Sequence, residues 1–280
     1  MKHTSIVTFF CLAFVLTSCD TKKEQATENP TSETKDSVAI SEAAQDELQL
    51  ENDPRKIGPA KPTSQYQIEE DIYKINSSEN PLYGYWVGAF GKNKINIALA
   101  QVVEDSIFGH SVCAGNFRAI KGTIKETDPG IYAVNMKEPG DDKYDGEFNF
   151  NIDLLKKELT GSWKPYQNTV GAKDYTLTKR QFKYDPTLGD FPQASTQVLD
   201  VPEVENLLPE EIEMIRNEIY ARHGYSFNNL KIRRIFDAKD WYIPMSVDIR
   251  EELTDIEAQN IHLLYNYEDY YEEYYDDYGR

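Results

Sequence analysis

The sequence is poor in the residues that build metal sites and covalent cross-links. Only three of its 280 residues are cysteines and only four are histidines. No two histidines have the His-x-x-x-His spacing, and neither cysteines nor carboxylates flank them in the way that zinc requires. A Gly-x-Ser-x-Gly nucleophile elbow is also missing. The sequence therefore predicts no metal, no cofactor and no recognisable catalytic residue.

Positive charge is scarce as well. The chain has 30 Lys and Arg against 48 Asp and Glu, which gives a net charge of -18 and a pI near 4.7. Phosphate backbones repel a protein this acidic, so nucleic-acid binding is excluded. After the first apolar run, no segment approaches the ~20 apolar residues that a membrane span requires.

The N-terminus has the pattern of a secretory signal. Lys2 and His3 precede the short apolar run "SIVTFFCLAFVL", which leads into "LTSC" ending at Cys19. This ending resembles the lipobox of bacterial lipoproteins, which implies a signal peptide over 1–18 and acylation, such as by palmitate, at Cys19. Cys11 then leaves with the signal peptide. Cys113 becomes the only candidate free thiol, and no intramolecular disulfide can form.

The residues after Cys19 bear on which membrane holds the anchor. Asp20 in this position resembles an inner-membrane retention signal of some enterobacteria, whereas Lys22, Lys23 and Glu24 loosely resemble a surface-export signal of other lineages. We expect a lipid-anchored cell-envelope protein in the outer membrane, exposed at the cell surface.

Residues 19–73 are predicted to be a disordered tether. The stretch from 21 to 65 is rich in Glu, Lys, Ser, Thr and Pro and contains no aromatic residue. Such a composition buries too little apolar area to offset the entropy of ordering. Roughly 40 flexible residues have a mean reach of about 35 Å, which holds a folded body clear of the membrane.

Residues 74–185 are predicted to form an antiparallel β domain. Short runs such as "KINIALAQVV" and "GEFNFNIDLL" alternate apolar and polar residues, with Gly and Asp clusters between them. About eight strands without a long helix indicate a barrel or a sandwich. With the helices described below, the fold class is α+β: an antiparallel β barrel or sandwich followed by a small three-helix domain.

Two residues of this domain resemble the closure of lipocalin-like barrels. Trp86 lies in "GYWVG", and Arg180 lies in "YTLTKR" near the end of the domain. The resemblance implies that Arg180 lies across the Trp86 indole and closes the barrel, a contact worth about 0.5 to 2 kcal/mol. The alternative is an ordinary buried tryptophan in a β core.

The stretch "GHSVCAGNFRAIKG" contains the polar groups best placed for a ligand in the β domain. His110, Asn116 and Arg118 could converge there. Cys113 lies in apolar surroundings, which favours a small buried side chain over a reactive nucleophile. His110 is an odd number of residues away and should point to the opposite face of the strand.

After a proline-rich linker, 186–206, the apolar period becomes helical. Pro209 is suited to the first helical position, and Gly224 is suited to the residue just past the end. Asn229 and the pair Thr254 and Glu257 should cap a second and a third helix.

The segment 207–267 resembles the YARHG domain, an extracellular module of bacterial surface proteins. The resemblance rests on Tyr220, Ala221, Arg222, His223 and Gly224, and on the element Asp240, Trp241 and Tyr242. It implies an extracellular location and no particular activity. Polar staples from Arg216, Glu218, Arg222 and Asp240 should support so small a core, although a binding site is the alternative role.

Residues 268–280 alternate acids with tyrosines. They form either a helical extension or a solvated acidic tail that contacts a basic partner.

Two functions follow from these patterns. The first is a non-catalytic binding or accessory module displayed on a tether, with an envelope protein or glycan as partner. The second is a lipid-anchored hydrolase acting on envelope material, which would require two facing carboxylates of divergent pKa. The sequence does not indicate an oligomeric state.

Overall fold

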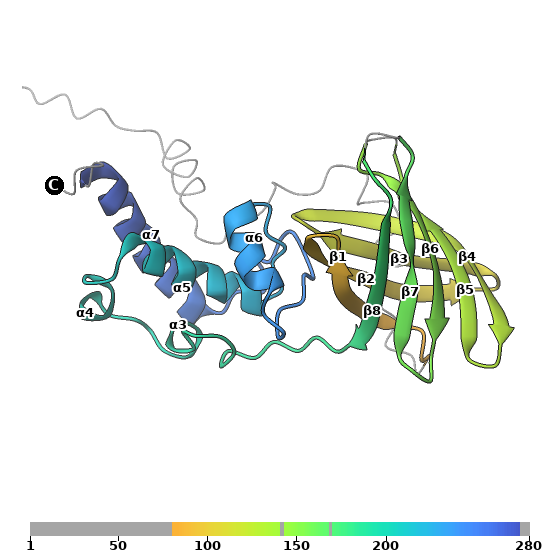
Figure 1. The fold of residues 1–280 in the computed structure, drawn as a ribbon. Helices are drawn as coiled ribbons and strands as arrows, with labels where there is room; N and C mark the ends of the chain where they lie inside the picture. The colour runs from red at the N-terminus through yellow and green to blue at the C-terminus, as the bar shows by residue number, and fades with distance from the viewer. Residues whose placement is uncertain (1–79, 141–142, 168–169, 275–280) are drawn as a thin grey trace, which may run out of the picture. The chain divides into compact units, whose positions relative to one another are not determined.

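A computed structural model describes residues 80–140, 143–167 and 170–274. The predicted signal peptide, Cys19, the tether and the last six residues lie outside the described residues. Those described belong to one compact unit, and they form an eight-stranded β barrel followed by helices (Figure 1). The fold is therefore α+β, as the sequence predicts, and the sheet closes as a barrel and not as a sandwich.

The barrel strands follow one another in sequence order, and each is antiparallel to the next. The last strand pairs with the first, so that no edge is left open. The strands are β1 (Gly84–Phe90), β2 (Asn93–Val103), β3 (Ser106–Cys113), β4 (Asn116–Asp128), β5 (Ile131–Lys137), β6 (Gly146–Asp153), β7 (Glu158–Pro165) and β8 (Lys173–Arg180).

Tight turns set the register of several hairpins. Between β3 and β4, Ala114 and Gly115 both have a positive φ, at 53° and 76°. Two consecutive left-handed residues are typical of the turn whose twist matches that of paired strands. A Cβ on Gly115 would also lie 2.7 Å from Asn228 Cβ, so the glycine permits a close approach of residues beyond the barrel.

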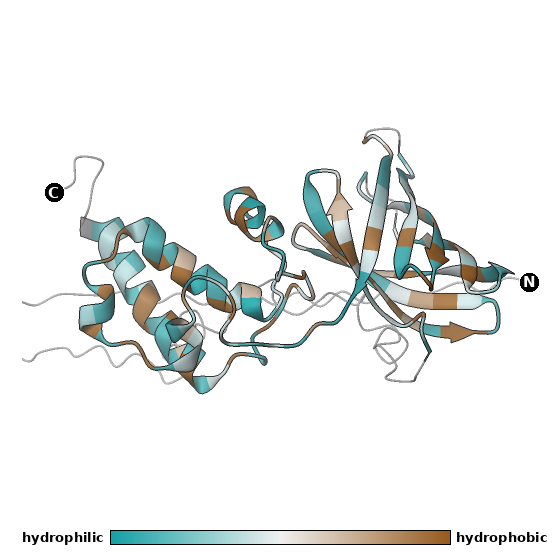
Figure 2. Ribbon diagram, turned by 60° about the horizontal axis from the view of Figure 1, so that its bottom comes forward, coloured by the Kyte–Doolittle hydropathy of each residue, from teal (hydrophilic) through white to brown (hydrophobic). Residues whose placement is uncertain are grey.

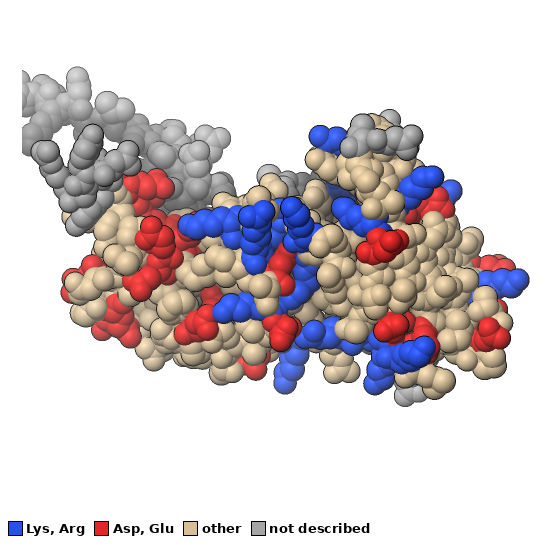
Figure 3. Space-filling model, in the orientation of Figure 1, with Lys and Arg blue, Asp and Glu red and all other residues tan. Residues whose placement is uncertain are grey.

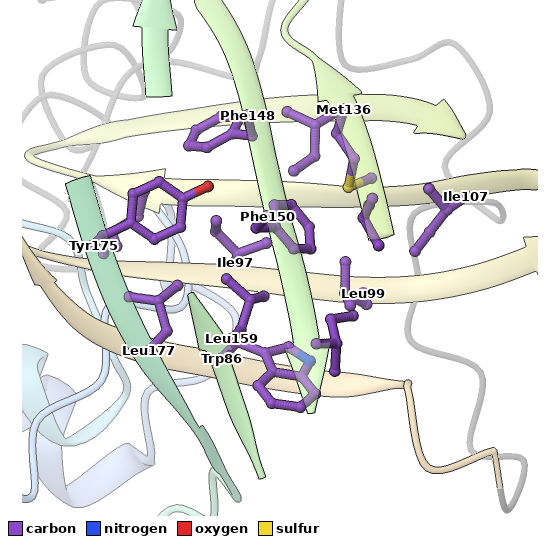
Figure 4. Packing of buried hydrophobic residues seen from close by; sticks show 14 of the residues in the cluster. Trp86, Ile97, Leu99, Ile107, Met136, Phe148, Phe150, Leu159, Tyr175 and Leu177 are labelled. Carbon is purple, nitrogen blue, oxygen red and sulfur yellow. The ribbon is translucent and has the colours of Figure 1, made fainter. Parts of the chain in front are cut away.

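Side chains that alternate along the strands fill the barrel interior. In β6, Phe148, Phe150 and Ile152 are buried, and the residues between them face outward. Figure 4 shows Phe148 and Phe150 among side chains from other strands of the barrel, Trp86 and Leu99 included. The same alternation appears as apolar and polar bands along the strands in Figure 2. Truncating a large core side chain of this kind to alanine costs about 3 to 5 kcal/mol.

Five helices follow the barrel within the described residues: α3 (Gln193–Thr196), α4 (Val201–Val204), α5 (Pro209–Arg222), α6 (Leu230–Asp237) and α7 (Asp255–Tyr274). The two short ones, α3 and α4, lie within the segment predicted to be a linker. The last one, α7, runs seven residues into the segment 268–280, so this part of the acidic stretch is helical.

The predicted helix caps are confirmed. Pro209 opens α5, and the Asn229 side chain accepts hydrogen bonds from the first turn of α6. Thr254 and Glu257 exchange hydrogen bonds of 3.2 and 3.0 Å as a capping box at the start of α7. These local signals need no knowledge of the fold, which is why the sequence reveals them.

The helical module has its own apolar core. Ile215 and Ile219 from α5 meet Ile261 and Leu264 from α7, while Phe236 comes from α6. The module also contacts β2, where the Lys94 backbone N–H donates to the Asp237 carboxylate over 2.9 Å.

Candidate functional site

A pocket of about 410 Å³ opens at the end of the barrel where the β1–β2, β3–β4, β5–β6 and β7–β8 connections lie. This volume falls within the roughly 300 to 1,000 Å³ of small-molecule sites. Its aromatic lining is Phe90, Tyr144, Phe148 and Trp163, and its charged lining is Arg118, Glu138, Lys173 and Arg233. Such a combination of apolar walls and a few charged groups is typical of a ligand site.

Phe90 is the centre of the aromatic wall. Its ring lies 6.2 Å from that of Phe148 and meets the Trp163 ring edge-on at 5.9 Å. The Lys173 ammonium lies 4.3 Å from the Phe90 centroid and 4.9 Å from that of Trp163. The position of Lys173 follows from the β7–β8 hairpin, in which Lys173 pairs directly with Trp163.

Glu138 is the acidic group of the pocket. Its Oε2 atom accepts hydrogen bonds from the Trp163 indole N–H at 2.9 Å and from the Gly146 backbone N–H at 2.8 Å. Burial raises the pKa of the carboxyl to about 7, even though both hydrogen bonds favour the charged form. Glu138 therefore takes both protonation states near neutral pH.

Two arginines reach the pocket from different parts of the chain. Arg118 Nε lies 3.2 Å from the buried carboxylate of Asp145. Arg233 comes from α6, and its guanidinium donates to the side chain of Asn93 and to the backbone carbonyls of Phe227 and Asn228. Every hydrogen-bond acceptor of Arg233 among the described residues is neutral.

The polar residues singled out in β3 and β4 divide between two environments. Asn116 and Arg118 line the pocket, as the sequence suggested. His110 stacks on Phe117 at 4.5 Å and does not line it. Cys113 does line the pocket, and burial raises the pKa of its thiol to about 12. A thiol so rarely ionised is a poor nucleophile.

Tyr175 lies inside the barrel against the aromatic wall. Its ring centroid is 5.7 Å from that of Phe90 and 6.1 Å from that of Phe148. The side chain is 5% exposed, and its hydroxyl has no hydrogen-bond partner among the described residues. A buried hydroxyl without a partner costs about 1 to 3 kcal/mol.

Tyr175→Phe should therefore raise the free energy of unfolding of the barrel by about 1 kcal/mol, because the change removes this hydroxyl and keeps the ring. Urea unfolding, followed by hydrogen exchange in barrel peptides, measures the effect. Tyr132→Phe, at a half-buried position on β5, is the control, and it should give no such gain because the Tyr132 hydroxyl is partnered by Glu126. A loss of stability in Tyr175→Phe would contradict the assignment, since it would mean that the hydroxyl makes a bond in the folded state.

Trp86 closes the barrel away from the pocket. It is fully buried, and its indole N–H donates to the Leu82 carbonyl at 3.2 Å. The cation over the ring is Lys179, whose Nζ lies 5.7 Å from the centroid. Arg180, which the lipocalin resemblance implied, pairs with Tyr85 and donates to the Asp240 backbone carbonyl. The β1–β8 register thus places the neighbouring residue over Trp86.

The YARHG motif is the C-terminal end of α5. Tyr220 and Ala221 are buried in the helical core. Gly224 follows the helix with a φ of 75°, and its N–H donates to the Ala221 carbonyl while the Tyr225 N–H donates to that of Tyr220. These two bonds form the Schellman helix end. A Cβ on Gly224 would lie 2.5 Å from Met245 Cγ, which makes the glycine doubly necessary.

Arg222 is a buried structural cation. Its guanidinium bonds Glu218 at 2.5 Å, the Ser195 hydroxyl at 2.9 Å and the Leu188 carbonyl at 2.7 Å. Glu218 in turn accepts from the backbone N–H groups of Asp190 and Phe191. One ion pair therefore joins α5 to the chain segment that enters the module.

His223 completes this network through Glu257. The His223 ring nitrogen lies 2.8 Å from Glu257 Oε2, and Oε1 accepts from Ser195 and Tyr184. Burial alone would raise the pKa of the Glu257 carboxyl. The hydrogen bond and charge of His223, together with hydrogen bonds from Thr254 and Ser195, outweigh burial and hold this pKa below its usual value. Each of these polar side chains is partnered within the module. The geometry supports a structural network at the motif.

The second motif element divides between core and surface. Tyr242 is 1% exposed, and its hydroxyl donates to the Tyr225 carbonyl at 2.7 Å. Trp241 packs edge-on against Phe236. Asp240 is exposed, and its backbone carbonyl, not its carboxylate, binds Arg180. Arg216, another predicted staple, forms an ion pair with Glu268 at 3.0 Å.

The sequence does not reveal three of the charged residues that line the pocket, Lys173, Glu138 and Arg233. Glu138 begins the stretch "EPGDDKYDG", which in the sequence is one of the Gly and Asp clusters that separate the strands. Lys173 could have been found from the hairpin, because "GSW" and "KDY" must pair if β7 and β8 are neighbours. Arg233 gives no such signal, since its position depends on a contact between separate parts of the fold.

The helices within the described residues include none that is both long enough and apolar enough to span a membrane. In the same part of the chain, no group of three or more His, Cys, Asp or Glu side chains is arranged to hold a metal ion.

Comparison with known proteins identifies one region of the chain. Residues 190–269 match the protein family described as the YARHG domain. No match was found among curated proteins. The C-terminal helices, with the buried network just described, are therefore a YARHG domain that follows an eight-stranded antiparallel barrel.

Proposed function

We propose that this chain is a lipid-anchored cell-envelope protein that acts without catalysis, as a binding or accessory module. The observation that carries the proposal is the pocket at the barrel mouth, where aromatic walls surround a few charged groups. The YARHG match is compatible with an accessory role. In this proposal the barrel binds a small ligand, and the YARHG domain, held together by its buried polar network, supports an envelope protein or glycan contact.

Cys113 offers a direct test of ligand binding, because it lines the pocket and reacts slowly. The full chain would be treated with methyl methanethiosulfonate, and modification of Cys113 would be followed by peptide mass spectrometry. Small-molecule fractions from the cell envelope that contain the ligand should slow this modification. The urea-unfolded chain is the control, and its rate should not change. If every fraction leaves the native rate unchanged, the pocket is not a ligand site.

The anchor is supported by the sequence "LTSC" at Cys19. Cells fed an alkyne analogue of palmitate should label the wild-type chain, and Cys19→Ala should lose essentially all label and leave the membrane fraction, because two or more acyl chains supply the attachment. Cys113→Ala is the matched control and should keep its label. Equal labelling of wild type and Cys19→Ala would remove the anchor from the proposal.

An outer-membrane position exposed at the surface remains part of the same proposal. Crosslinking of intact cells, followed by affinity capture and mass spectrometry, tests both the position and the partner. A specific envelope partner that disappears in Cys19→Ala supports an anchored accessory protein. Recovery of cytoplasmic proteins alone would overturn it.

One observation favours a second candidate function, a hydrolase that acts on envelope material. Glu138 has a pKa of about 7, and the charge of Asp145 contributes to it. General acids of neutral-pH enzymes have such values. Both acids are, however, engaged by protein donors. Release of soluble fragments from purified envelope glycan by wild type, but not by Glu138→Gln, would support this candidate.

A further inference from the structure

We infer that the ligand of the barrel pocket is an anion with a flat aromatic or apolar body, and that Lys173 is the residue that selects its negative charge. This inference rests on the proposed function, because it assumes that the pocket binds a small molecule. It goes further by naming the chemical class of the ligand and the residue that recognises it.

The pocket is lined by more positive than negative side chains, whereas the chain as a whole is negatively charged. The chain carries a net charge of -18, yet the pocket lining has three cations, Arg118, Lys173 and Arg233, and one carboxylate, Glu138. Asp145 pairs with Arg118, so Lys173 and Arg233 are the lining cations that have no ion pair among the described residues. Basic side chains also gather over α6, which contributes Arg233 (Figure 3). A cleft of one sign with low-dielectric walls concentrates ions of the opposite sign. In an acidic protein, a local excess of cations marks this pocket for an anion.

Lys173 is the cation least satisfied by the protein. Its ammonium faces the rings of Phe90 and Trp163. None of the ion pairs among the described residues involves Lys173. Cation–π contacts are weaker than charge-assisted hydrogen bonds to a carboxylate or phosphate. The aromatic pair therefore holds the ammonium at the mouth and leaves its N–H groups available to an anionic ligand.

Arg233 supplies a second cation from the YARHG domain. It is held by three neutral acceptors, two of them backbone carbonyls, and it also forms no ion pair within the described part of the chain. The guanidinium keeps its charge at any ordinary pH, and the nearby carboxylate of Asp237 accepts a hydrogen bond from the Lys94 backbone N–H instead. Its position gives the anion a second attraction besides Lys173.

The aromatic lining and the volume of the pocket indicate the size and shape of the uncharged part of the ligand. Phe90, Phe148 and Trp163 line the pocket, and an aromatic wall of this kind pairs best with another flat ring or an apolar body. A pocket of about 410 Å³ lies at the small end of the range for ligand sites. An aromatic carboxylate or phosphate fits this description better than a long acyl chain.

A matched pair of probes tests the inference. Calorimetric titration of the full chain in a non-ionic detergent, with blanks in detergent alone, would compare 2-naphthoate with the neutral isostere 2-naphthamide. The wild type should bind naphthoate at least about tenfold more tightly, since a charge-assisted contact contributes that much. Added salt should weaken naphthoate binding and leave naphthamide binding unchanged.

Variants then assign the preference to one residue. Lys173→Met should lose at least about tenfold in affinity for naphthoate and less than threefold for naphthamide, while Lys173→Arg keeps the preference. Lys164→Met, which removes an exposed lysine beside Trp163 that does not line the pocket, should match the wild type.

The outcomes separate the inference from the proposed function. Equal affinity of the wild type for both probes, or equal losses of both in Lys173→Met, would overturn the anion preference and leave ligand binding intact. No binding of either probe would overturn the inference, and the Cys113 protection experiment would then decide the proposed function by itself.

Discussion

Arg222→Met should destabilise the YARHG domain by about 3 to 5 kcal/mol. The change leaves the buried carboxylate of Glu218 without its cation and also removes the bonds to Ser195 and Leu188. Removal of one partner from a buried ion pair has a cost of this size. Hydrogen exchange followed by mass spectrometry measures it, because peptides from α5 and α7 should lose protection while barrel peptides keep theirs.

Arg234→Met is the matched control for this experiment. Arg234 is an exposed arginine on α6, where a substitution changes the free energy of unfolding by at most about 0.5 kcal/mol. If Arg222→Met lost no more protection than Arg234→Met, the motif would not be a structural network. The residues would then have to be explained by a binding role.

Glu138→Gln should abolish a pH dependence of barrel stability. The pKa of Glu138 is raised from about 4.5 to about 7, so the folded state holds the proton more tightly than the unfolded chain. The stability contributed by this proton is complete below pH 4.5 and is lost as the pH rises through 7. The full loss is about 3 kcal/mol. At pH 8, Glu138→Gln should be more stable than the wild type by a similar amount, because a neutral amide can still accept both hydrogen bonds.

Urea unfolding at pH 5, 6, 7 and 8, read from the hydrogen exchange of barrel peptides, gives the comparison. Glu126→Gln, an exposed position on β4, is the control and should follow the wild-type curve. Parallel curves for the wild type and Glu138→Gln would show that the carboxyl titrates alike in the folded and unfolded states. The raised pKa would then be wrong.

The sequence predicts the strands and helices of this fold better than it predicts the contacts between them. Period-2 alternation marks the strands because each has one face in the core, and Asn229 and Thr254 reveal helix starts through local hydrogen bonds. Closure of the barrel, unlike the strands and helix caps, has no local signal in the sequence. It joins β1 to β8 across the whole domain, and nothing local fixes that register.

A shift of one residue in register explains why Lys179, and not the expected Arg180, lies over Trp86. The sequence offers Lys179 and Arg180 side by side, and only the pairing of Trp86 with Lys179 decides which cation lies over the ring. The pocket is hidden for the same reason. Its lining comes from the ends of separate strands and from α6, so neither Glu138 nor Arg233 stands out until the barrel is closed.

The Glu257 contacts also set an order for the folding of the chain as it emerges from its N-terminal end. The barrel is complete once β8 is available, whereas Tyr184, Ser195 and His223 must all wait for a carboxylate near the start of the last helix. Arg222 finds its partners earlier in the chain, but until α7 emerges His223 lacks its carboxylate and the apolar core is incomplete, which exposes the segment to proteases and chaperones. A truncated chain that ends before Glu257 should therefore carry a finished barrel and an unfinished second domain.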